Sequence, residues 1–192
     1  MAKSRKEIST KQMKIRHDTV RIVTLALLIA LQVVLSRFLS INLQFLKIGF
    51  SFIPLMFAGY LYGASGGVIV AATSDLIGSL LFPSGPFFPG FTVTAALAGF
   101  VYGLVLNGKC TTLKITVGVL AEQVICSLLL NSWWLSILYH SPFTVLLTTR
   151  IWQVLVMTFV EIVFAEIFFK RASFIHKLKS ELTKYNKEKR TG

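Results

Sequence analysis

Polar and charged side chains within long apolar stretches are the first candidates for chemistry in this sequence. Such groups are costly in a membrane and usually mark a ligand or ion site. They are Arg37, Asp75, Asn131 and Arg150, and helical spacing puts all four in the outer half of a predicted helix bundle. Two interpretations are open: an Asp75–Arg150 salt bridge that only holds helices together, and a ligand pocket that opens to the outside.

Polar and aromatic neighbours add to this set. Ser79 follows Asp75 at i+4 and Gln153 follows Arg150 at i+3, so each shares a helix face with its partner. The loop Pro-Phe-Phe-Pro-Gly-Phe contains Phe87 and Phe88 between prolines that stiffen it, which suits a lid over a flat ligand. The predicted substrate-binding residues are Arg37, Lys47, Asp75, Ser79, Phe87, Phe88, Asn131, Trp134, Arg150 and Gln153.

These residue types indicate the chemistry of the ligand. Asp75 and Asn131 suit hydrogen bonds to an amino-substituted ring. Arg37, Lys47 or Arg150 suits carboxylates, which an arginine binds in bidentate fashion. A flat heterocycle joined to an acidic tail fits this set.

Catalytic and metal-binding patterns are missing from the sequence. It contains no phosphate-binding glycine motif, and its three histidines are scattered along the chain. We therefore expect no catalytic residue, no metal and no cofactor. Energy for uphill transport would have to come from partner subunits.

Composition indicates an integral membrane protein. Hydrophobic residues make up 54% and charged residues 15%, with a mean hydropathy of +0.70, against about 25% charged residues in an ordinary soluble domain. The net charge of +12 does not point to nucleic acid, because the basic residues flank membrane spans and suit the anionic lipids of the cytoplasmic leaflet.

Hydropathy predicts an all-α bundle of six transmembrane helices. The stretch from residue 48 to 82 is split at the Gly63–Gly67 turn signal, and Pro54 is expected to kink the second span. The spans are approximately 19–39, 48–62, 68–82, 91–106, 113–138 and 143–169, each judged against a requirement of about 20 residues.

The positions of the basic residues orient the bundle. All Lys and Arg residues except Arg37, Lys47 and Arg150 fall before or at the edge of the first span, after the last span or beside the loop that follows residue 106. Cytoplasmic segments carry this excess, so both termini are predicted to be cytoplasmic. The predicted regions are a basic N-terminal segment (1–18), a membrane domain (19–170) and a basic C-terminal tail (171–192).

Small residues recur at four-residue spacing in two spans. Ala26 and Ala30 lie in the first, and Ala95, Gly99 and Gly103 lie in the fourth. Such ridges allow helices to approach closely. They serve either packing within the bundle or docking of another membrane subunit.

Several stretches together resemble the S components of energy-coupling-factor (ECF) vitamin transporters, most closely the folate-specific members. The similarity covers about residues 20–169. It is carried by Ser36–Phe38, Ile48–Pro54, Tyr62–Gly67, Asp75–Gly78, Phe88–Ala95 and the series Asn131, Trp134 and Arg150.

The resemblance implies a six-helix fold in a bacterial cell membrane that binds folate or a reduced folate from outside. It also implies docking onto a transmembrane coupling subunit attached to two ATPases, with Ala26 and Ala30 facing that subunit. Arg37 lies on the same ideal helical stripe as this pair, so either the helix deforms near Ser36 or Arg37 reaches around its end. The alternatives are an S component for riboflavin or thiamin, and a non-transport membrane scaffold.

Overall fold

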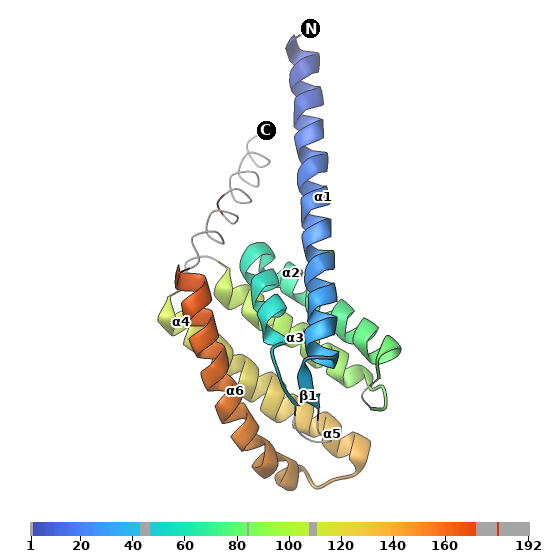
Figure 1. Cartoon of the computed structure of the whole chain (residues 1–192), viewed down its shortest axis with the longest axis vertical. Coiled ribbons are helices and arrows are strands. Elements are labelled where there is room, and N and C mark those ends of the chain that lie inside the picture. The colour runs from blue at the N-terminus through green and yellow to red at the C-terminus, as the bar shows by residue number, and fades with distance from the viewer. Residues whose placement is uncertain (1, 43–46, 84, 108–110, 172–179, 181–192) are drawn as a thin grey trace.

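The computed structural model describes residues 2–42, 47–83, 85–107, 111–171 and 180 (Figure 1). Its elements are α1 (Ala2–Arg37), β1 (Ser40–Asn42), β2 (Lys47–Gly49), α2 (Phe52–Leu81), α3 (Pro89–Leu106), α4 (Thr112–Ala121), the π-helix η1 (Glu122–Leu130), α5 (Asn131–Tyr139) and α6 (Phe143–Arg171). The predicted C-terminal tail lies outside the described residues apart from Arg171 and Ser180.

Helices long and apolar enough to cross a membrane dominate the described residues. Five such helical stretches are present, with α4, η1 and α5 forming one continuous stretch from Thr112 to Tyr139. The prediction of a helical membrane protein is therefore confirmed. A short antiparallel hairpin of β1 and β2 joins α1 to α2, with Ile41 paired to Ile48.

The predicted split of the second stretch corresponds to an interruption inside α2. Gly63 has φ 68° and ψ −159°, a conformation that side chains with a Cβ rarely adopt, and Figure 1 shows α2 changing direction. The expected kink at Pro54 is wrong, because Pro54 lies in the first helical turn, where its missing N–H breaks no helical hydrogen bond.

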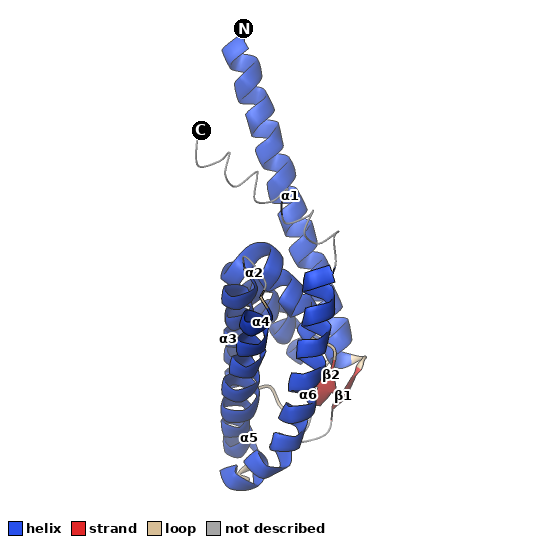
Figure 2. Ribbon diagram, turned by 90° about the vertical axis from the view of Figure 1, so that its left-hand side faces the viewer, coloured by secondary structure: helices blue, strands red, loops and turns tan. Residues whose placement is uncertain are grey.

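Contacts around Gly63 place this interruption at one end of the bundle. The Arg21 guanidinium lies 5.7 Å from the centre of the Tyr62 ring, and a Cβ on Gly63 would lie 2.6 Å from Asn107 Nδ2. The interruption is thus level with the start of the first span and with the end of α3. Figures 1 and 2 show the end of α6 toward this same end, and the α5–α6 turn at the opposite end.

Glycines let α2 and α3 approach backbone to backbone. A Cβ on Gly67 would lie 2.9 Å from the Gly99 carbonyl carbon, and a Cβ on Gly103 would meet the backbone of Ala64. Of the two roles predicted for the small residues of the fourth span, Gly99 and Gly103 therefore serve internal packing. Ala26, by contrast, is exposed on α1.

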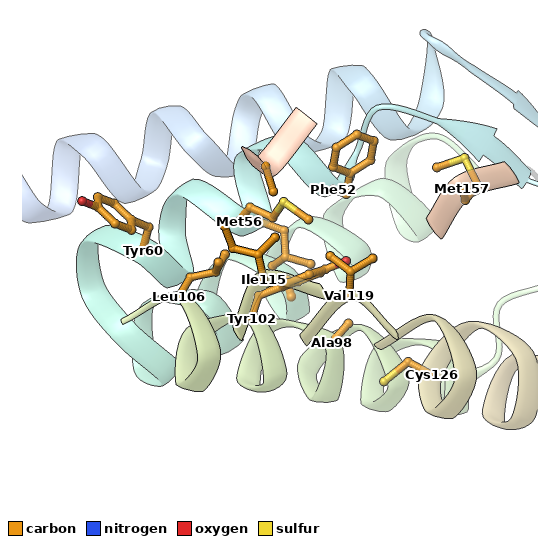
Figure 3. Close-up of a cluster of buried hydrophobic side chains, with 13 residues drawn as sticks. Phe52, Met56, Tyr60, Ala98, Tyr102, Leu106, Ile115, Val119, Cys126 and Met157 are labelled. Carbon is orange, nitrogen blue, oxygen red and sulfur yellow. The ribbon is translucent and has the colours of Figure 1, made fainter. Parts of the chain in front are cut away.

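Apolar side chains from most of the helices meet in one cluster (Figure 3). Met56 of α2, Tyr102 of α3 and Ile115 of α4 are almost completely buried there. Large apolar residues on the outside, such as Trp152 and Phe159 of α6, are more than two-thirds exposed. This distribution suits a bundle whose outer surface faces lipid, where tight packing stabilises helix association.

Candidate functional site

A cavity of about 360 Å³ lies where the C-terminal end of α1, α2, α3 and the helices from η1 to α6 converge. Seven of the predicted binding residues line it: Arg37, Asp75, Ser79, Phe87, Phe88, Asn131 and Arg150. Lys47 lies in β2, and its side chain is outside the described residues. The structure thus brings together residues that are separated by more than half of the chain.

Asp75 pairs with a different arginine from the one expected. Arg37 Nη2 lies 3.9 Å from Asp75 Oδ1, and the Thr92 hydroxyl donates to Asp75 Oδ2 at 2.8 Å. The alternative of an Asp75–Arg150 salt bridge is therefore wrong. Helix α1 stays regular up to Arg37, whose side chain reaches over Gly78 of α2.

Arg150 is the most strongly buried cation of the cavity. Its side chain is only 4% exposed, and neither Nε nor Nη1 has a hydrogen-bond partner among the described residues. A buried guanidinium without partners is costly, because the charge has lost its water without compensation. The Arg150 side chain is therefore positioned to donate to an acceptor group of a ligand.

Aromatic rings form one wall of the cavity. The Phe88 ring lies 6.0 Å from that of Phe91 and 5.5 Å from that of Trp134. Trp134 does not itself line the cavity; its Nε1 donates to the hydroxyl of Thr94, which does, at 2.9 Å. A Cβ on Gly90 would lie 2.6 Å from Trp134 Cδ2, so a glycine here allows this packing.

A second cavity of about 150 Å³ adjoins the first, and the predicted residue Gln153 lines it. Glu122 and Asn131 line both cavities. Asn131 directly follows the nine-residue π-helix that Glu122 begins. In an α-helix, positions nine apart face opposite sides. A π-helix holds about 4.4 residues per turn, so nine residues make about two turns and return to the same face.

Several site residues escaped the sequence interpretation. Glu122 and Glu161 lie within predicted spans, so the rule that selected Asp75 applies to them as well. Gln32, inside the first predicted span, is another residue that this rule could have selected. The small hydroxyl residues of the walls carried no such signal, because serine and threonine are common in membrane helices. They are Ser36, Ser51, Ser74 and Thr94.

Known proteins resemble this chain in sequence. The family model described as "ECF transporter, substrate-specific component" matches residues 20–169. A "Folate transporter FolT" of Clostridium novyi (strain NT) is 38% identical over 130 residues, which cover 66% of this chain and 74% of the relative. A "Folate transporter FolT" of Leuconostoc mesenteroides subsp. mesenteroides is 33% identical over 147 residues, or 73% of this chain and 79% of that relative.

A solved structure shares the fold. It is described as "Crystal structure of FolT bound with folic acid" and superimposes with a TM-score of 0.74 at 31% identity, covering 78% of this chain and 94% of the other. The family match includes every residue that lines the cavity. The chain is therefore a member of the family of substrate-specific components of ECF transporters.

Proposed function

We propose that this chain binds folate from outside the cell as the substrate-specificity subunit of an ATP-driven importer. The observation that carries the proposal is the composition of the cavity, which combines an aromatic wall with two arginines, Arg37 and the more deeply buried Arg150. A flat ring joined to an acidic tail matches that combination. Two relatives named as folate transporters and the similarity to a structure with bound folic acid support it.

The site residues divide between the two parts of folate. Arg37 contacts the glutamate carboxylates, a role that the sequence also suggests for Lys47, while Phe87 and Phe88 cover the aromatic part of the vitamin. The Arg37–Asp75 pair is partly exposed, with side-chain exposures of 13% and 25%. The two charged groups are 3.9 Å apart, near the outer limit for a salt bridge, so a ligand carboxylate can compete with Asp75 for the Arg37 guanidinium.

Other vitamins suit the cavity less well. Thiamin is cationic and would meet Arg37 and Arg150. Riboflavin has no carboxylate, so Arg37, which is assigned to the acidic tail, would have no acidic group of the ligand to bind. A membrane scaffold would have no use for a buried guanidinium with unpaired donors.

Six crossings with both termini in the cytoplasm are the proposed topology, in a bacterial cell membrane. The interruption at Gly63, level with Arg21 and Asn107, supports two crossings by α2. The basic residues before the first span and after the last support the orientation.

Partner subunits complete the proposed importer. A transmembrane coupling subunit binds the outer face of α1, and two ATPases attached to that subunit supply the energy. The exposed alanines Ala26 and Ala30 support this docking surface, because small side chains let a partner helix approach closely.

Replacing Ala26 and Ala30 with tryptophan is expected to separate binding from transport. The double variant retains folate affinity, since neither alanine lines a cavity. Uptake of labelled folate by cells that also express the coupling subunit and ATPases falls by about tenfold or more, because bulky side chains block close helix approach.

Leu104→Trp is the matched control, because Leu104 is 58% exposed on α3. This variant should transport folate at the wild-type rate. Uptake that needs no partner subunits, or that survives both alanine replacements, would contradict the proposed docking surface.

A further inference from the structure

Thr92 of α3 contacts a residue of the larger cavity but lies behind the cavity wall. Its hydroxyl donates to Asp75 Oδ2 at 2.8 Å, and Asp75 lines the larger cavity. Thr92 itself belongs to the lining of neither cavity. A change at Thr92 can therefore affect a bound ligand only through the residues that it contacts.

The two helices that carry this hydrogen bond are fixed relative to each other. Gly67 of α2 and Gly99 of α3 meet backbone to backbone. Asp75 and Thr92 each lie about two helical turns from that contact, toward the same end of the bundle. The close approach of the backbones therefore sets the distance across which the Thr92 hydroxyl reaches the carboxylate.

The Arg37 guanidinium lies against the backbone of α2, close to Asp75. A Cβ on Gly78 would lie 2.7 Å from Arg37 Nε, so a glycine at this position leaves room for the guanidinium. Just beyond the two helices, the rings of Phe38 and Phe82 meet edge to face at 5.2 Å. Since the end of α1 is held against α2 in this way, the Asp75 carboxylate is the part of the pair that can turn.

The separation of the two charges is long for an ion pair. Arg37 Nη2 lies 3.9 Å from Asp75 Oδ1, which is about 1 Å longer than a charge-assisted hydrogen bond between such groups. A carboxylate binds an arginine best with both oxygens, but Asp75 Oδ2 accepts from the Thr92 hydroxyl. The hydroxyl therefore holds the carboxylate toward α3 and away from a close bidentate contact with the guanidinium.

We propose that Thr92 is a positioning residue that keeps the Arg37 guanidinium accessible to the carboxylates of the folate tail. The inference rests on the proposed function, in which Arg37 binds that tail. Without the hydroxyl, the Asp75 carboxylate turns both oxygens toward Arg37 and competes with the ligand for the guanidinium. The Asp75 charge also repels the carboxylates of the tail. This role differs from the hydrogen bond to the ring that the sequence suggests for Asp75.

Thr92→Val tests the inference, because valine has nearly the shape of threonine but no hydroxyl. The purified chain is titrated with folic acid, and pterin, the ring of folate without its tail, is measured in competition with labelled folate. Thr92→Val is expected to weaken folate about fivefold, an effect of the size that a partly exposed ion pair can have. Pterin affinity should stay at the wild-type value, because pterin has no tail carboxylate.

A second substitution identifies Asp75 as the group through which Thr92 acts. Asp75→Asn should bind folate at least as tightly as wild type, because the competing charge is gone. The double variant, Thr92→Val with Asp75→Asn, should match Asp75→Asn alone, so the two effects are not additive. A packing defect caused by valine would persist in the double variant. Thr92→Ser keeps a hydroxyl and should bind folate like wild type.

Thr24→Val is the matched control and should bind like wild type. The Thr24 hydroxyl donates to the Val20 carbonyl of its own helix at 2.8 Å, and Thr24 lines neither cavity. Unchanged folate affinity in folded Thr92→Val, an equal loss of folate and pterin, or a double variant as weak as Thr92→Val would overturn the inference and leave the proposed function standing. Failure of folded wild-type protein to bind folate would contradict the proposed function itself. If Thr92→Val does not fold, Asp75→Asn decides, since weaker folate binding than in wild type would overturn the inference.

Discussion

Arg150→Gln will weaken folate binding by about 100-fold or more, which corresponds to about 2.7 kcal/mol. The wild-type guanidinium is buried with two donors unpaired, so a ligand acceptor gains a charge-assisted hydrogen bond that glutamine cannot replace. Thermal stability without ligand should stay the same or rise, because the variant removes an uncompensated buried charge. Calorimetric titration and thermal unfolding of the purified variant measure both effects.

Two further arginines serve as comparisons for this result. Arg37→Gln should weaken folate but not pterin, because Arg37 is assigned to the tail. Arg21→Gln should change neither, since Arg21 packs over Tyr62, away from both cavities. Wild-type folate affinity in Arg150→Gln would show that the buried guanidinium has no ligand.

Gly67→Leu or Gly99→Leu will destabilise the bundle by about 3 kcal/mol. Each glycine faces the backbone of the other across the α2–α3 contact, and backbone atoms cannot rotate away as a side chain can. For a chain of this size, that cost lowers the unfolding midpoint by about 6–12 °C. Thermal unfolding in detergent, followed by size-exclusion chromatography, measures the loss.

Val93→Leu is the control for added bulk on the same helix, because Val93 is 56% exposed on α3. It should unfold at the wild-type temperature. A Gly67→Leu protein as stable as wild type would mean that α2 and α3 are not in backbone contact.

Hydropathy and charge predicted the membrane helices because these signals depend only on the order of residues along the chain. The turn expected at Gly63 also followed from local sequence, since only glycine adopts its backbone conformation readily. Depth in the membrane likewise follows from residue number, so most of the predicted binding residues do meet in one cavity.

The direction of each side chain around its helix was harder to predict. The pairing of Asp75 with Arg37 depends on how α1 packs against Gly78, which the spacing within one helix does not encode. Glu122 and Asn131 face the same cavities only because a π-helix lies between them. An ideal α-helix would turn one of the two away.

Titration of folic acid into the purified chain, in the absence of partner subunits, tests the central claim most directly. Trp134 lies against Phe88 at the edge of the cavity, so its fluorescence should also report binding. The expected result is saturable one-to-one binding in the nanomolar range that neither riboflavin nor thiamin displaces. A folded, monodisperse protein that shows no saturable heat or quenching with folic acid would contradict the account.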